Sequence, residues 1–203
     1  MLDVDGIPEA VGWYLAGFTD GEGSFNVSFR PRNDYVLPWK VSLCFNISQR
    51  DPVVLELFQR QLRCGTMRQR ADGVWYFEVN HLADITRNVI PFFERFGFLS
   101  AKKQRDFAKF KQLAELITSG RHLSRDGVAE VLIIRREMND GGKRRYGEQE
   151  ILDRFENPQR PYARRSSKPR VMRWSDLHGD MQSAAEMTAP LSSNDRSNNN
   201  ERS

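Results

Sequence analysis

The chain has few of the residues that build metal centres or disulfide scaffolds. Its 203 residues include two cysteines, Cys44 and Cys64, and three histidines. These numbers exclude a zinc-finger lattice and favour a reduced, intracellular protein of the cytoplasm, nucleoid or an organelle matrix. No apolar run approaches the roughly 20 residues that cross a bilayer. The N-terminus lacks the basic and apolar regions of a signal peptide, so neither a membrane protein nor a secreted one is expected.

Net charge is also small, at +4, and by itself names no binding partner. Basic residues are missing from the first 29 positions, which carry five acids. Residues 30–111 hold fifteen basic and eight acidic residues, a net of +7, and residues 160–173 hold six basic residues and no acid. An acidic start beside a basic body favours polyanion binding next to a cation site. A surface with unevenly distributed charge would give the same pattern.

Apolar periodicity alternates along the chain between the spacing of helices and that of strands. Apolar residues at helical spacing predict helices at 8–20, 53–62, 81–93, 101–117 and 125–138. Alternation of apolar and polar residues predicts strands at 24–30, 39–48, 66–70 and 74–79. Gly21 and Gly23 are expected to end the first helix, and Pro91 to kink the third.

The order helix, hairpin, helix, hairpin and helices predicts an α+β fold. Helices then pack on one face of a four-stranded antiparallel sheet, and the other face is polar. Residues 1–140 are predicted to form the domain, without an internal repeat. Residues 141–203 are predicted to be a basic, then polar C-terminal extension, largely disordered apart from a short helix at 149–155.

Residues 15–23, LAGFTDGEG, resemble the signature of the LAGLIDADG homing endonucleases. The elements over residues 11–117 follow that family's order. The resemblance implies an αββαββα fold whose free sheet face binds DNA. It also implies an intron-encoded, site-specific endonuclease that hydrolyses both strands of a long, near-palindromic double-stranded target and leaves 3′ overhangs. The alternative is a non-cleaving protein on the same scaffold, either an intron-splicing maturase that would bind intron RNA or a transcription regulator. Neither interpretation involves a membrane or a small-molecule substrate.

Two acids, Asp20 and Glu22, stand two positions apart at the end of the first predicted helix. Two carboxylates that approach each other repel unless a divalent cation lies between them. Asp20 is more simply interpreted as a capping residue in a polar turn. The resemblance assigns Glu22, just past the expected helix end, as the metal ligand. Glu22 and the Gly21 carbonyl would hold Mg²⁺, or Mn²⁺ or Ca²⁺ in the same site.

The motif occurs once, whereas the family needs two motif helices to build one pair of active sites. The resemblance therefore implies a two-fold homodimer. Small residues spaced four apart let two helix backbones approach closely. The residues predicted at the dimer interface are Gly12, Leu15, Ala16 and Gly17.

Two further catalytic residues are implied only by the resemblance. Gln49 matches a polar residue that positions the attacking water, and Lys102 matches a lysine that polarises the scissile phosphate. Lys103 is a close rival to Lys102. Without the resemblance, both would be interpreted as ordinary surface residues. Val53 departs from members that carry another basic residue there, and Arg50 is its possible substitute.

The polar face of the predicted sheet is the expected DNA-binding surface. A twisted pair of strands fits the major groove, where Arg, Lys, Asn and Ser contact phosphates or base edges. A sheet face that only contacts solvent would be expected to carry more acidic residues, whereas Glu78 is the one acid in this set. The predicted DNA-binding residues are Asn26, Ser28, Arg30, Arg32, Lys40, Ser42, Asn46, Arg68, Arg70, Tyr76 and Glu78.

Overall fold

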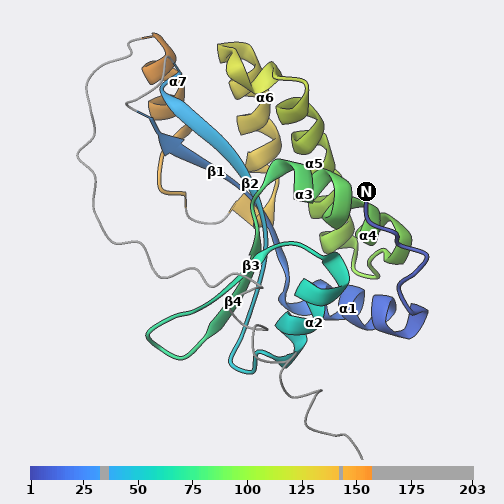
Figure 1. Cartoon of the computed structure of the whole chain (residues 1–203). Coiled ribbons are helices and arrows are strands. Elements are labelled where there is room, and N and C mark those ends of the chain that lie inside the picture. The colour runs from blue at the N-terminus through green and yellow to red at the C-terminus, as the bar shows by residue number, and fades with distance from the viewer. Residues whose placement is uncertain (33–36, 142–143, 157–203) are drawn as a thin grey trace, which may run out of the picture.

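A computed structural model describes residues 1–32, 37–141 and 144–156 (Figure 1). Its first half contains α1 (Glu9–Glu22), β1 (Ser24–Pro31), β2 (Trp39–Gln49), α2 (Val53–Leu62), β3 (Thr66–Gln69) and β4 (Trp75–Val79). Its second half is helical throughout. It contains α3 (Leu82–Asp84), η1 (Ile85–Val89), α4 (Ile90–Phe96), α5 (Ala101–Thr118), η2 (Arg121–Leu123), α6 (Arg125–Arg136), η3 (Asn139–Gly141) and α7 (Glu148–Glu156).

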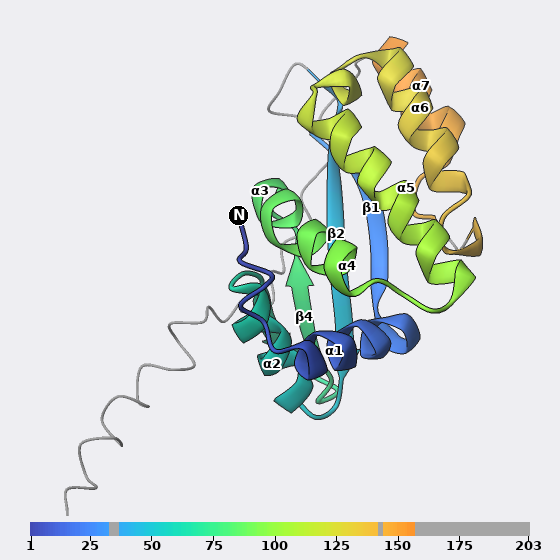
Figure 2. The same cartoon turned by 90° about the vertical axis from the view of Figure 1, so that its right-hand side faces the viewer.

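The four strands form one antiparallel sheet in the order β1-β2-β4-β3. Figure 2 looks onto the helical side, where α1, α4 and α5 lie in front of the strands. The predicted α+β fold class is therefore confirmed. In the part of the chain that the structure describes, no helix is long and apolar enough to cross a membrane.

Phenylalanine rings fill the core between the sheet and its helices. Phe25 of β1 lies 5.3 Å from the ring of Phe45 on β2, and its centroid distances to Phe93 and Phe110 are 5.6 and 4.9 Å. Such ring pairs contribute about 0.5–1.5 kcal/mol each beyond the area they bury. Packing from α4 and α5 thus holds the first residues of β1, which directly follow α1.

The junction of α1 and β1 is sharper than predicted. Glu22 is the last helical residue, not the first residue after the helix, and Gly23 caps the helix in an extended conformation. A Cβ at Gly23 would lie 2.4 Å from Cγ2 and 2.9 Å from the carbonyl oxygen of Thr19. Only glycine lets the strand leave the helix this closely.

The third predicted helix runs from α3 through η1 into α4, and η1 is a π-helical turn. Pro91 lies in the first turn of α4, directly after η1. Proline has no N–H and crowds the preceding turn, so the widened turn accommodates it without ending the helix. The expected distortion therefore lies just before Pro91.

Residues after 140 contribute to the same core. Tyr146 and Ile151 are buried, and Trp39 Nε1 of β2 donates to the Ile151 carbonyl at 3.0 Å. The rings of Trp39 and Tyr146 lie 4.9 Å apart. The packed core therefore extends past the predicted boundary at residue 140, to α7. The rest of the predicted disordered extension, residues 157–203, lies outside the described residues.

Candidate functional site

The C-terminal end of α1 lies next to the N-terminal end of α5, where β1 begins (Figure 2). Hydrogen bonds from Leu99, Ser100 and Lys103 join the two helices there. The same turn of α1 carries both acids of the motif. The predicted acids therefore lie beside the first turn of α5, which carries both candidate lysines.

Asp20 holds the start of α5. Its carboxylate accepts from Leu99 N at 3.2 Å, from Ser100 N at 2.9 Å and from the Ser100 hydroxyl. Partial burial raises the pKa of Asp20, but these hydrogen bonds outweigh it and the pKa is lowered. Asp20 thus holds Ser100 in place, and the Ser100 hydroxyl is the side-chain cap of α5, accepting from Lys103 N at 3.2 Å.

Glu22 is exposed and makes no hydrogen bond or salt bridge to another described residue. Gly21 beside it is open, with no atom within 4 Å of where a Cβ would lie. Carbonyl groups in the last turn of a helix have no intrahelical partner. A carboxylate with such carbonyl oxygens is the donor set that hard cations such as Mg²⁺ take. Within residues 1–32, 37–141 and 144–156 no group of three or more His, Cys, Asp and Glu could hold a metal.

The two neighbouring lysines point to different places. Lys103 is half-buried, and its Nζ donates to the Gly23 carbonyl at the end of α1. Lys102 is exposed and pairs with Asp140. One residue turns a helix by about 100°, so only one of the two can face α1. The structure therefore brings Lys103, rather than the predicted Lys102, to the candidate site.

Burial lowers the pKa of Lys103, and the carboxylates of Asp106, Asp20 and Glu22 oppose that shift by attracting the ammonium. Its hydrogen bond to a carbonyl requires the Nζ to act as donor. Lys103 is therefore a partly desolvated cation beside the motif acids.

Gln49 ends β2. The first residue of β1, Ser24, pairs with Asn46 of β2. From Asn46, β2 runs on for three more residues to Gln49, which pairs with Trp75 of β4. The extra residues of β2 lie at the end of the sheet where α1 ends. The structure thus places Gln49 and Glu22 at the same end of the sheet.

Three of the four residues predicted at the dimer interface are buried within the subunit. Leu15 and Ala16 belong to the core, and a Cβ at Gly12 would lie 2.2 Å from the ring of Phe96. Gly17 is exposed, and a Cβ there would have no atom of another element within 4 Å. Helical rotation separates two stripes of small residues, and the stripe of Gly12 and Ala16 packs inward. The interface prediction was wrong for Gly12, Leu15 and Ala16.

The face of α1 that is left open carries other residues. Trp13 and Tyr14 are 52% and 51% exposed, and Gly17 and Gly21 follow Trp13 at successive intervals of four. The covered part of each ring contacts a phenylalanine, Phe96 for Trp13 and Phe18 for Tyr14, at centroid distances of 5.7 and 6.2 Å.

Side chains of β1 and β2 alternate between the core and the polar face, as predicted. Arg30 and Lys40 pair directly across the two strands, and both are exposed. Like charges in opposite positions repel, and a bound polyanion would relieve that repulsion.

The β3–β4 hairpin differs because its charges are already paired. Arg68 Nη2 lies 2.9 Å from Glu78 Oε1, and Arg70 contacts Asp72 at 3.3 Å and the Tyr76 hydroxyl. Both guanidinium groups lie over the Tyr76 ring. The predicted residues of this hairpin form one connected group on the polar face.

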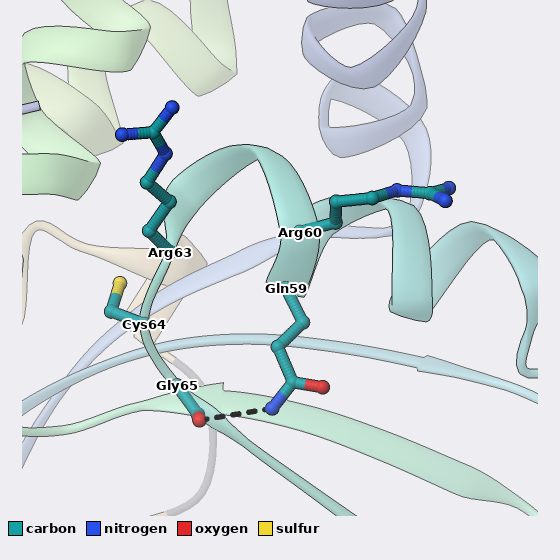
Figure 3. Close-up of a pocket in the computed structure, with 5 residues that line it drawn as sticks. All are labelled: Gln59, Arg60, Arg63, Cys64 and Gly65. Atoms are coloured by element: carbon teal, nitrogen blue, oxygen red, sulfur yellow. Dashed lines mark hydrogen bonds between the residues drawn. The ribbon is translucent and has the colours of Figure 1, made fainter. Parts of the chain in front are cut away.

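A separate pocket lies at the C-terminal end of α2 (Figure 3). Gln59 Nε2 donates to the Gly65 carbonyl at 3.2 Å, while Arg60 and Arg63 point to opposite sides. Burial raises the pKa of Cys64 to about 12, which keeps its thiol neutral. These side chains diverge and include none of the candidate site residues.

Known proteins with a similar sequence or structure show which family the chain belongs to. A family model described as LAGLIDADG endonuclease matches residues 15–114. The chain belongs to the LAGLIDADG endonuclease family. A curated relative, the probable intron-encoded endonuclease 2 of Neurospora crassa, is 29% identical over 132 residues, which cover 63% of this chain and 29% of that protein. The chain thus spans less than a third of that relative's length.

Two solved structures share the LAGLIDADG fold. The homing endonuclease I-TnaI is 26% identical with a TM-score of 0.62, over 75% of this chain and 99% of that one. The meganuclease I-SmaMI, in a crystal structure with uncleaveable DNA, is 27% identical with a TM-score of 0.61, over 64% of this chain and 46% of that one. The LAGLIDADG helix of the present chain is α1.

Proposed function

We propose that the chain is a homing endonuclease that hydrolyses both strands of a long, near-palindromic DNA target and leaves 3′ overhangs. The observation that carries this proposal is the free carboxylate of Glu22 at the exposed end of the LAGLIDADG helix. Lys103, on the adjoining helix, adds a cation at the same place. Retention of both groups favours cleavage over a non-cleaving role on the same scaffold.

Glu22 and the Gly21 carbonyl are the groups that would hold Mg²⁺, Mn²⁺ or Ca²⁺. Such a cation, when bound, supplies an activated water and stabilises the leaving 3′ oxygen. Lys103 is placed to donate a hydrogen bond to a non-bridging phosphate oxygen and to offset its developing charge. Gln49, at the end of β2, would orient the attacking water through its side-chain amide.

A two-fold dimer would complete the site, because one chain brings one Glu22. The open stripe of Trp13, Gly17 and Gly21 supports pairing through this face of α1. Two glycines four residues apart let the helices approach closely enough to bring both carboxylates together. Each pair of chains would then hold one metal centre for each DNA strand.

The polar sheet face would lie along the major groove. The repulsion between Arg30 and Lys40 supports phosphate contacts at this position of the β1–β2 pair. The paired arginines of the β3–β4 hairpin would exchange their intramolecular partners for base edges, since Arg favours guanine and Glu favours cytosine. Both cysteines are free thiols, which agrees with a reducing compartment such as the cytoplasm or an organelle matrix.

Selection of cleaved sites from a random double-stranded DNA library tests the proposal. The purified chain is incubated with the library in Mg²⁺, and a parallel reaction contains EDTA. We expect a long recovered site with two-fold symmetry, 3′ overhangs, and no product in EDTA. Recovery of no cleaved sequence in Mg²⁺, or equal cleavage in EDTA, would contradict the proposed function.

A further inference from the structure

Three consecutive residues after α6 have a left-handed backbone. The φ angles of Asn139, Asp140 and Gly141 are 52°, 52° and 69°. Asparagine and aspartate tolerate this conformation better than most residues, but it persists only where other contacts hold it. Asn139 N donates to Asp106 Oδ1 of α5 at 3.2 Å, and Asp140 pairs with Lys102. The turn is thus held against the same first turns of α5 that carry Lys103.

The side chain of Asn139 reaches the edge strand β1. Its Nδ2 donates to the Phe25 carbonyl at 2.8 Å and to Asn26 Oδ1 at 3.1 Å. A backbone carbonyl can only accept, so Nδ2 must face Phe25 and the amide cannot be turned round. The second N–H of the same group then requires an acceptor on Asn26. A carbonyl of the strand therefore sets the orientation of both amides.

Asn26 is held at its other end as well, because its Nδ2 donates to Ser24 Oγ at 3.0 Å. A side-chain amide has two N–H donors and two lone pairs. One of each is used here, and the structure records no third partner for this amide among the described residues. One N–H and one lone pair of the Asn26 amide therefore remain unused on the polar sheet face, and their relative positions are fixed.

The neighbours of Asn26 on this face are short. Ser24 and Ser28 flank it on β1, and Cys44 is its partner across β2. The Ser28 hydroxyl is turned toward the Ser42 carbonyl at 3.4 Å. The amide of Asn26 is thus the longest group on this stretch of β1, and a base edge can approach it.

We propose that Asn26 recognises an adenine in the major groove, and that Asn139 is the positioning residue that sets its amide orientation. Adenine presents an acceptor, N7, next to a donor, the N6 amino group. Guanine presents two acceptors, thymine one acceptor and cytosine one donor, so each satisfies only half of the amide. The inference rests on the proposed function of this face as a DNA-binding surface. In a two-fold dimer the adenine would occur once in each half-site.

Selection by binding tests this independently of cleavage. Wild type and the Asn26→Ala and Asn139→Asp variants select DNA from a random library in Ca²⁺, and affinity is then measured with each base at each position. The Asn26→Ala variant identifies the position that Asn26 contacts. There we expect wild type to prefer adenine about 5- to 100-fold.

The Asn139→Asp variant puts an oxygen where Nδ2 was, and this oxygen can donate neither to the Phe25 carbonyl nor to Asn26 Oδ1, so the contact that fixes the Asn26 amide is lost. We expect its adenine preference to fall to within about twofold, with preferences at other positions unchanged. Asn46→Ala is the matched control. It lies on the same face and its amide contacts Cys44 Sγ rather than Asn139, so it should change a different position.

Base analogues keep the test decisive if Asn139→Asp does not fold. In wild type, replacing this adenine by 7-deazaadenine, which lacks N7, or by purine, which lacks the amino group, should each weaken binding about 5-fold or more. Absence of an adenine preference, indifference to both analogues, or equal loss of preference at every position in Asn139→Asp would overturn the inference. Selected DNA that binds with the adenine preference but is not cut in Mg²⁺ would support the inference and contradict the nuclease proposal.

Discussion

The last turns of α1 have two sides that differ in how much of the chain they contact. On the side facing α5, Asp20 accepts three hydrogen bonds and Lys103 donates to Gly23. Away from these contacts, a Cβ at Gly17 or Gly21 would meet no atom of another element within 4 Å, and Glu22 has no hydrogen-bond partner among the described residues. Chemically similar acids two residues apart therefore serve different purposes. One stabilises the fold, and the other is free for a metal, DNA or a second subunit.

The largest expected effect is on the rate of DNA cleavage, when Glu22 is replaced. Replacing Glu22 by Gln removes the charge that would bind the cation, and we expect DNA cleavage to slow on the order of 10³-fold or more. Thermal stability should be unchanged, because Glu22 makes no hydrogen bond to any residue that the structure describes. Single-turnover cleavage and calorimetry measure both. A wild-type cleavage rate would exclude Glu22 from the chemistry.

Substitutions of Lys102 and Lys103 test which lysine of α5 acts in cleavage. We expect Lys103→Met to slow cleavage about 10²-fold, and Lys102→Met, whose side chain pairs with Asp140 in solvent, to change it less than about threefold. Single-turnover rates at saturating enzyme measure each. A larger loss in Lys102→Met than in Lys103→Met would reverse the assignment.

The pH dependence of cleavage checks the charge of Lys103. Burial lowers its pKa, so its positive charge is lost at a lower pH than the usual value of about 10.4. Cleavage that needs this cation should therefore decline as the pH rises toward that value. Lys103→Arg stays charged and should lack the decline. An identical alkaline decline in this variant would assign it to another group.

A bulky substitution at Gly17 tests whether two chains pair through the exposed face of α1. Gly17→Arg places a long charged side chain where two helices would meet, and we expect the dimer dissociation constant to rise at least about 100-fold. Gly147→Arg is the control, since a Cβ at Gly147 would also have no atom within 4 Å. Sedimentation equilibrium measures both variants. An unchanged association in Gly17→Arg would place the interface elsewhere.

The smallest expected effect is on the free energy of unfolding, when Asp20 is replaced. Asp20→Asn keeps the size but weakens the hydrogen bonds to α5, and we expect a loss of about 1 kcal/mol in unfolding free energy. The folded-state pKa of Asp20 is lowered, so its contribution is present above about pH 4 and is lost as the pH falls through the folded-state value. Urea unfolding at a series of pH values from 7 downward should show the difference between the two proteins shrink in acid. A constant difference would contradict this account.

Much of the fold could be predicted because its periodicities are local. Alternation in residues 24–30 and 39–48 indicated which side chains of β1 and β2 are buried, and the LAGLIDADG motif located α1 and Glu22. The short helix at 149–155 was predicted, but the burial of Tyr146 and Ile151 was not, because the segment around them has too few apolar residues for a clear period. Their burial comes from Trp39, far away in the sequence.

The sequence by itself determined the order of elements, the family and the acid at position 22. Periodicity and a contiguous motif are properties of neighbouring residues, so no contact across the chain is needed to recognise them. Only the tertiary structure decided that Asp20 holds Ser100 at the start of α5, that Lys103 rather than Lys102 meets α1, and that Asn139 donates to Asn26. Each of these depends on how one element is rotated against another, and packing of the phenylalanine core sets that rotation.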